Sequence, residues 1–123
     1  MSVAGKTAIV TGAGTGIGRA TAQLLAQHGA RVVAAGLQPD RLRETVDAIT
    51  RAGGEAIAVD ADVSDPQAIE QVASSAQHAF GGTDVLVNNA AVYPIGPWHE
   101  MDVEQWDAVF ATNIRGYFLM ARA

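Results

Sequence analysis

Short apolar runs alternate with stretches of helical periodicity along the whole sequence, and this alternation restricts the fold more than any other feature. Four runs are expected to be strands, at residues 7–10, 31–35, 56–63 and 85–87. Between and after these runs, apolar residues recur every three or four positions, which is the spacing of a helix with one buried face. Strands that alternate with helices in this way predict an α/β fold, a doubly wound parallel sheet with helical crossovers.

Residues that favour helix ends support the same order of elements. Pro39 and Pro66 can open the second and third helices, and Asp102 can cap the last helix. We expect the first three helices to bury, in order, the apolar faces Ile17, Ala20, Leu24 and Leu25; Leu42, Val46 and Ile49; and Ile69, Val72, Ala73 and Ala76. The last helical stretch carries Val103, Trp106, Val109 and Phe110, and then Ile114, Tyr117, Phe118 and Ala121. The chain therefore predicts one domain that spans residues 1–123.

Composition excludes several classes of function. The net charge is −5, and the 8 basic residues are scattered, which argues against nucleic acid or an anionic membrane as a partner. The chain has no Cys, so disulfides and thiolate metal sites are excluded, and the spacing of the three His residues predicts no metal site. The first residues do not resemble a signal peptide, and no apolar run reaches the length of a membrane span. We therefore expect a cytoplasmic protein.

The stretch VTGAGTGIG, residues 10–18, joins the first strand to the first helix. In a doubly wound sheet this turn lies at the carboxyl edge, where ligands bind, and the helix N-terminus offers unpaired N–H groups to an anion. Glycines let a phosphate approach the backbone closely. The spacing does not match the GxxxxGK[ST] loop or the GxGxxG fingerprint, but it does match TGxxxGxG at Thr11, Gly12, Gly16 and Gly18.

The TGxxxGxG motif resembles that of the short-chain dehydrogenase/reductase family, which implies a Rossmann-like sheet with strand order 3-2-1-4 in this chain. The resemblance assigns cofactor contacts in the glycine loop to Gly12, Thr15, Gly16, Ile17 and Gly18. It runs from Lys6 to the last residue of the chain.

Three further landmarks resemble the family in order and spacing. Asp62 and Val63 match the pair that contacts the adenine, although an Asp at a strand end can equally cap the next turn. In the stretch NNAA, the resemblance places Asn89 beside the cofactor ribose, whereas Asn88 is expected to brace neighbouring strands. Asn113 matches a member of the catalytic group that holds a water in a proton relay, and a mid-helix Asn needs a polar partner in any case.

The sequence leaves the choice between NAD and NADP open. Where NAD-preferring relatives carry Asp, this chain has Gly36, and the next position, often Arg in relatives that use NADP, is Leu37. The other position that is often basic in relatives that use NADP, just before the second glycine of the motif, is Thr15 in this chain. Arg41 in the following helix is a weak candidate for a phosphate contact. Leu37 is nevertheless expected to contact the cofactor.

The family's catalytic Tyr and Lys, spaced YxxxK, are missing from this chain. Pro97 stands four residues after Tyr93, and Ala121 stands four residues after Tyr117. The resemblance therefore implies that this is the cofactor-binding half of an NAD(P)-dependent oxidoreductase that interconverts an alcohol and a carbonyl, and we expect it to be inactive alone.

An alternative is a non-catalytic nucleotide-binding or assembly module, and a methyltransferase or flavin-binding variant fits the spacing poorly. The apolar stretch 117–120 and the fourth strand, which would be an exposed edge, suggest a homo-oligomer.

Overall fold

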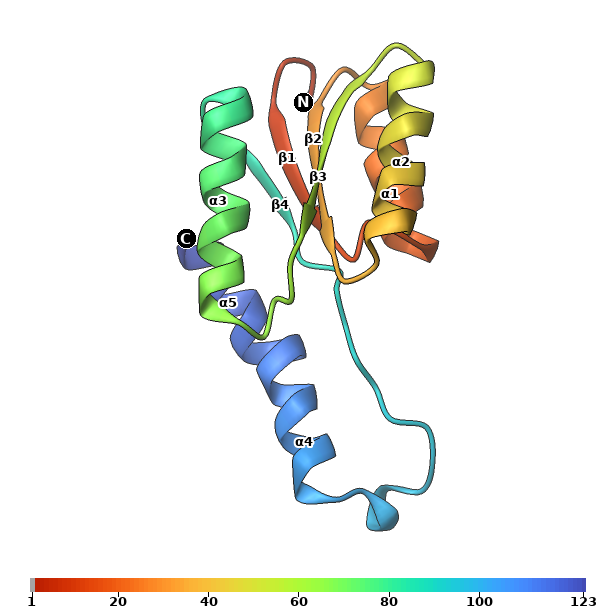
Figure 1. The fold of residues 1–123 in the computed structure, drawn as a ribbon, viewed down its shortest axis with the longest axis vertical. Helices are drawn as coiled ribbons and strands as arrows, with labels where there is room; N and C mark the ends of the chain where they lie inside the picture. Colours follow the sequence, from red (N-terminus) through yellow and green to blue (C-terminus); the bar gives the residue numbers. More distant parts are fainter. Residues whose placement is uncertain (1) are drawn as a thin grey trace.

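Four strands form one parallel sheet in the computed structural model, which describes residues 2–123 (Figure 1). The strands are β1 (Thr7–Thr11), β2 (Arg31–Gly36), β3 (Glu55–Asp60) and β4 (Val85–Val87). Their order across the sheet is β3-β2-β1-β4, and every neighbouring pair is parallel. The predicted α/β fold and strand order are confirmed, with β4 as a half-buried edge strand.

Helices cover both faces of this sheet. The helical elements are α1 (Gly16–Gln27), α2 (Pro39–Arg51), α3 (Pro66–Phe80), a 3-10 turn η1 (Trp98–Glu100), α4 (Val103–Phe110), a π-turn η2 (Ala111–Arg115) and α5 (Gly116–Arg122). In Figure 1, α1 and α2 lie on one face and α3 on the other, while α4 continues away from the sheet. No helix between residues 2 and 123 has the length and apolar character that crossing a membrane would require.

Two apolar clusters fill the spaces between the sheet and its helices. Successive side chains of a strand point to opposite faces, so Ile9 and Val33 join the cluster beneath α3, whereas Val10 and Val32 join the cluster beneath α1 and α2. Met120 of α5 also belongs to the first cluster and is only 5% exposed. The clusters fix both layers of helices against the sheet and so fix the positions of the loops at its carboxyl edge.

The predicted buried face of α1 is largely wrong, since Leu25 alone of its four residues packs against the core. Its buried residues are Gly18, Ala22 and Ala26, whereas Ile17 and Leu24 are 78% and 55% exposed. The helical period is the expected one, but α1 lies so close to the sheet that small residues face it. The third strand also ends at Asp60, before the predicted end at residue 63.

The predicted helix starts agree with the structure. Pro39 and Pro66 lie in the first turns of α2 and α3, and the Asp65 carboxylate accepts a hydrogen bond from the Gln67 amide at 3.0 Å. Asp102 forms a capping box with Gln105, in which each side chain accepts from the other residue's backbone N–H. These caps satisfy N–H groups that helix ends otherwise leave unpaired.

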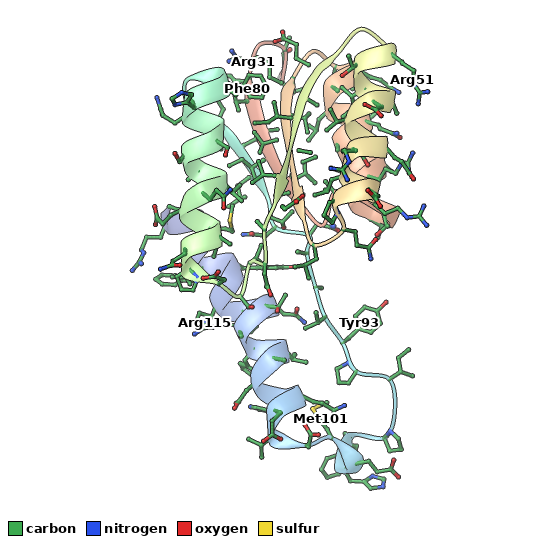
Figure 2. The ribbon with its side chains drawn as sticks, in the orientation of Figure 1. Arg31, Arg51, Phe80, Tyr93, Met101 and Arg115 are labelled. Carbon is green, nitrogen blue, oxygen red and sulfur yellow. The ribbon has the colours of Figure 1, made fainter. Side chains whose placement is uncertain are left out.

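The segment between β4 and α4 runs away from the sheet before the chain returns along α4 (Figure 1). Figure 2 shows Tyr93 pointing outward from this segment. Ile95 and Trp98 are 95% and 84% exposed. The segment therefore presents apolar side chains with few contacts to the rest of the described chain.

Candidate functional site

A cleft of about 420 Å³ lies at the carboxyl edge of the sheet. The glycine loop, the ends of β2, β3 and β4, and the start of the π-turn all contribute residues to it. Its lining residues are Gly12, Gly14, Thr15, Gly36, Leu37, Gln38, Leu42, Ala61, Asp62, Val63, Ser64, Ala90, Ala91, Val92, Ala108, Ala111 and Thr112. This edge is where open α/β sheets bind ligands.

The glycine loop is shaped by backbone requirements that only glycine meets. Gly12 and Gly16 adopt positive φ angles of 65° and 52°, a region that L side chains rarely occupy. A Cβ added to Gly18 would lie 2.1 Å from the Gly12 carbonyl oxygen, so α1 can begin this close to β1 only with glycine there. A Cβ added to Gly16 would meet nothing within 4 Å. The loop therefore leaves space beside its backbone at the helix N-terminus.

A set of hydrogen bonds joins this loop to the end of β4. The buried Thr11 hydroxyl accepts from the backbone N–H groups of Asn89 and Ala90, both at 3.0 Å. In return, the Asn89 side-chain amide donates to the Thr11 and Gly12 carbonyls at 3.0 and 3.3 Å. Asn89 thus fixes the wall of the cleft and is not among the residues that line it.

Asn88 and Asn89, though adjacent, serve different neighbours. The Asn88 amide donates to the Tyr117 carbonyl in α5 at 3.2 Å, which ties β4 to that helix. Its Oδ1 atom is buried without a partner among the described residues. Asn88 was expected to brace neighbouring strands, whereas its observed partner is a helix.

Asp62 lines the cleft and also organises the turn after β3. Its Oδ1 atom accepts from the Ser64 backbone N–H at 2.9 Å and from the Ser64 hydroxyl at 2.7 Å. The turn-capping interpretation of Asp62 therefore has a structural basis. Neither bond uses Oδ2, and the residue is exposed beside Val63 at the cleft.

Asn113 lies in the π-turn and makes a two-way pair with the backbone of Val92. Its Oδ1 accepts from the Val92 N–H at 2.9 Å, and its Nδ2 donates to the Val92 carbonyl at 2.7 Å. The polar partner that a mid-helix Asn requires is thus a backbone segment that lines the cleft. Asn113 itself is not among the lining residues, so it reaches the cleft through Val92.

The nine predicted cofactor residues gather at one edge, although they do not contribute equally. Gly12, Thr15, Leu37, Asp62 and Val63 line the cleft. Gly16, Ile17 and Gly18 form the first turn of α1, which follows the lining residue Thr15, and Asn89 follows β4. Sequence reasoning missed Ser64 and Thr112, which also line it. Neither residue stands out from its neighbours in sequence. Thr112 reaches the cleft because η2 is joined to the segment after β4 by the Asn113–Val92 pair.

Charge is sparse in the cleft. Asp62 is the one ionisable residue among the described residues that line it. No group of three or more His, Asp or Glu residues that could hold a metal ion occurs within residues 2–123. An anionic ligand would therefore be held chiefly by backbone N–H groups of the glycine loop, as helix N-termini do elsewhere.

The sheet order, the glycine turn after β1 and the cleft at the carboxyl edge define a Rossmann-like α/β protein. A sequence profile of the short chain dehydrogenase family matches residues 6–123. The chain therefore belongs to the short chain dehydrogenase family.

Comparison with individual proteins agrees with this assignment. An uncharacterized oxidoreductase of Bacillus subtilis, YxbG, is 43% identical over 118 residues, which cover 95% of this chain and 43% of the relative. A short chain dehydrogenase/reductase from Burkholderia phymatum, solved in complex with NAD, superposes with a TM-score of 0.95 at 38% identity, and the match covers 99% of this chain and 43% of that one.

L-Sorbose reductase from Gluconobacter frateurii, solved with NADPH and L-sorbose, superposes with a TM-score of 0.93 at 33% identity, over 99% of this chain and 47% of that one. The chain thus spans about half the length of the relatives it matches. Relatives of this chain bind either NAD or NADPH.

Proposed function

We propose that residues 1–123 form the dinucleotide-binding domain of an NAD(P)-dependent oxidoreductase that interconverts an alcohol and a carbonyl. The observation that carries this proposal is the glycine loop, whose backbone leaves open space at Gly16 beside the N-terminus of α1. A dinucleotide pyrophosphate fits such a loop, because close backbone approach and the helix dipole both favour it. Bound there, the nicotinamide would supply or accept the hydride.

Each predicted residue is proposed to contact one part of the dinucleotide. Gly12, Thr15, Gly16, Ile17 and Gly18 would hold the pyrophosphate, Asp62 and Val63 the adenine, and Leu37 and Asn89 the sugar groups. The free Oδ2 of Asp62 suits the exocyclic amine, since Oδ1 is used by Ser64. Asn89 would act at the ribose from its place in the Thr11 network.

Asn113 is proposed as a catalytic residue that holds a water in a proton relay. Both ends of its amide bond to Val92, so a water would use the second acceptor position of Oδ1. The Tyr and Lys that would exchange the substrate proton lie outside this chain in the proposal. A continuation without a YxxxK pair would contradict the oxidoreductase assignment.

Substrate turnover separates an enzyme from a non-catalytic binding module. We expect the 123-residue chain alone to show no turnover and the full-length protein to oxidise or reduce a small alcohol or carbonyl. Dinucleotide binding without turnover in the full-length protein, over a broad panel of carbonyls, would favour the binding module.

Thr15→Asp tests the cofactor site directly. Thr15 is the N-cap of α1 and makes no side-chain cap bond, so Asp there is compatible with the helix. Its carboxylate would face the pyrophosphate, and we expect dinucleotide affinity in the full-length protein, measured by NADH and NADPH fluorescence, to fall at least about 10-fold. Gln71→Glu adds the same charge at an exposed position of α3 and should leave dinucleotide affinity unchanged. Equal binding by Thr15→Asp and wild type would refute the site.

We also propose that the protein is a homo-oligomer that works in the cytoplasm, where its dinucleotide would be recycled by other oxidoreductases. The surface that supports association is not the 117–120 stretch as a whole, because Met120 is buried against the core. It is instead the exposed apolar row at Val103, Trp106, Phe110, Ile114 and Phe118, which are 45–70% exposed. A stable monomer at high concentration in sedimentation would contradict association.

A further inference from the structure

The outer end of the cleft, where β2 ends, carries no carboxylate. Gly36, Leu37 and Gln38 line the cleft there. In NAD-selective sites an acidic side chain at this point accepts hydrogen bonds from the ribose and repels a 2′-phosphate. This chain has no such repulsion at position 36, so a phosphorylated ribose can be accommodated.

Arg41 does not itself line the cleft, but its Cβ lies against Gly14, which does. A Cβ added to Gly14 would lie 3.0 Å from the Cβ of Arg41, so the first turn of α2 packs directly on the glycine loop. Gln38, the N-cap of α2, and Leu42 in its first turns both line the cleft. Gly14, which falls outside the TGxxxGxG pattern, thus has a packing role, because it allows this close approach.

Two arginines compete for a single acidic partner at this place. Arg19 and Arg41 both pair with Oε2 of Glu44, at 3.3 and 3.5 Å. Two cations and one anion leave one positive charge beside an otherwise neutral part of the cleft. The Arg41 and Glu44 side chains are 57% and 51% exposed, and exposed pairs of this kind contribute little. Arg41 can therefore exchange Glu44 for a stronger anion.

A carboxylate near the end of β2 would instead favour NAD, so the nearby acidic residues need to be considered. Asp40 is committed to Arg43 and raises the pKa of that guanidinium through their hydrogen bond. Asp60 pairs with Gly36 in the sheet register, yet it is exposed and does not line the cleft. Because the sheet register places it beside Gly36, Asp60 is the alternative group that could accept a hydrogen bond from a ribose hydroxyl.

We propose that Arg41, assisted by Arg19, binds the 2′-phosphate of NADP, so that the site selects the phosphorylated dinucleotide and Glu44 limits that selectivity. This inference rests on the proposed dinucleotide-binding function. A guanidinium suits the task because its planar donors match phosphate oxygens and remain charged at all relevant pH values.

The test measures four ligands on the full-length protein: NADPH, NADH, 2′,5′-ADP and 5′-AMP. We expect wild type to bind NADPH and 2′,5′-ADP at least about 10-fold more tightly than their unphosphorylated counterparts, as a charge-assisted contact predicts. Arg41→Ala should remove most of that difference while leaving NADH affinity within about twofold. Glu44→Gln should strengthen the binding of NADPH and 2′,5′-ADP and leave the binding of NADH and 5′-AMP unchanged.

Matched variants separate a local contact from a general charge effect. Arg43→Ala removes the same charge two residues along α2 and should leave the preference intact. Arg41→Lys should keep part of it, and circular dichroism should show all variants folded, since these side chains are exposed.

The possible results distinguish failure of the proposed dinucleotide-binding function from failure of the inference about Arg41. Failure of all four ligands to bind would refute the proposed function itself. Binding of NADH and NADPH with equal affinity, or an equal loss of both in Arg41→Ala, would overturn the inference and leave the proposed function standing. If the protein prefers NADH and Asp60→Asn reverses that preference, then Asp60, and not Arg41, determines cofactor preference at the ribose.

Discussion

Gly18→Ala is expected to destabilise the protein strongly although it adds a single methyl group. The new Cβ would lie 2.1 Å from the Gly12 carbonyl oxygen and 2.5 Å from the Asn89 side-chain nitrogen. The Gly12 carbonyl is backbone, and it is held by the Asn89 amide at 3.3 Å. Relief therefore requires α1 to move away from the sheet or the loop to lose its link to β4.

Three contributions set the size of the effect. Overpacking costs about 1–3 kcal/mol, and loss of the bond from Asn89 to Gly12 costs about 1 kcal/mol. Ala in place of Gly in a helix returns at most about 1 kcal/mol. The net loss in free energy of unfolding is about 1–3 kcal/mol, which lowers the urea midpoint by roughly 1 M.

Urea unfolding followed by far-ultraviolet circular dichroism measures this loss. Gly36→Ala is the matched control, because its Cβ would meet Leu42 at 3.5 Å, an ordinary contact, and its φ is not positive. We expect that control to stay within about 0.5 kcal/mol of wild type. A Gly18→Ala protein as stable as Gly36→Ala would refute the close approach of α1 to the loop.

Three other substitutions test the framework of the site. Thr11→Val leaves two backbone N–H groups without their acceptor and should cost about 2–4 kcal/mol in urea unfolding, whereas Thr11→Ser should keep most of the stability. Asn113→Asp places a carboxylate against the Val92 carbonyl, which raises the pKa of the new acid above its unfolded value; its stability should therefore fall as pH rises through that pKa, and a pH-independent difference from wild type in thermal unfolding would contradict the pairing. Asp102→Ala removes the capping box and should lower stability by about 1 kcal/mol, with Asp102→Asn retaining most of it, as thermal unfolding would show.

The fold was predictable because it is encoded in local signals. Short apolar runs and the 3.6-residue periodicity, together with Pro39, Pro66 and Asp102, predict the number and order of most elements, and the structure agrees. The buried face of α1 was not predictable in this way. Hydrophobicity points to Ile17 and Leu24, but α1 lies so close to the sheet that the buried positions are the small residues Gly18, Ala22 and Ala26.

The candidate site likewise has a part that local sequence predicts and a part that depends on long-range contacts. The spacing of Thr11, Gly12, Gly16 and Gly18 predicted where a dinucleotide loop would stand, because backbone conformation there depends on residues adjacent in sequence. The sequence also predicted that Asn113 needs a partner, but it did not identify Val92, which is 21 residues away.

By itself, the sequence determined the α/β order, the glycine turn and the family resemblance, since each rests on local periodicity or on fixed spacing. Tertiary structure alone decided that the Thr11 hydroxyl holds Asn89 and Ala90, and that Arg19 and Arg41 share Glu44 beside Gly14. Apart from the Arg41–Glu44 pair, which lies within α2, these contacts join residues 25 to 79 positions apart. They exist because the helices pack on the sheet at particular distances, which no local pattern encodes.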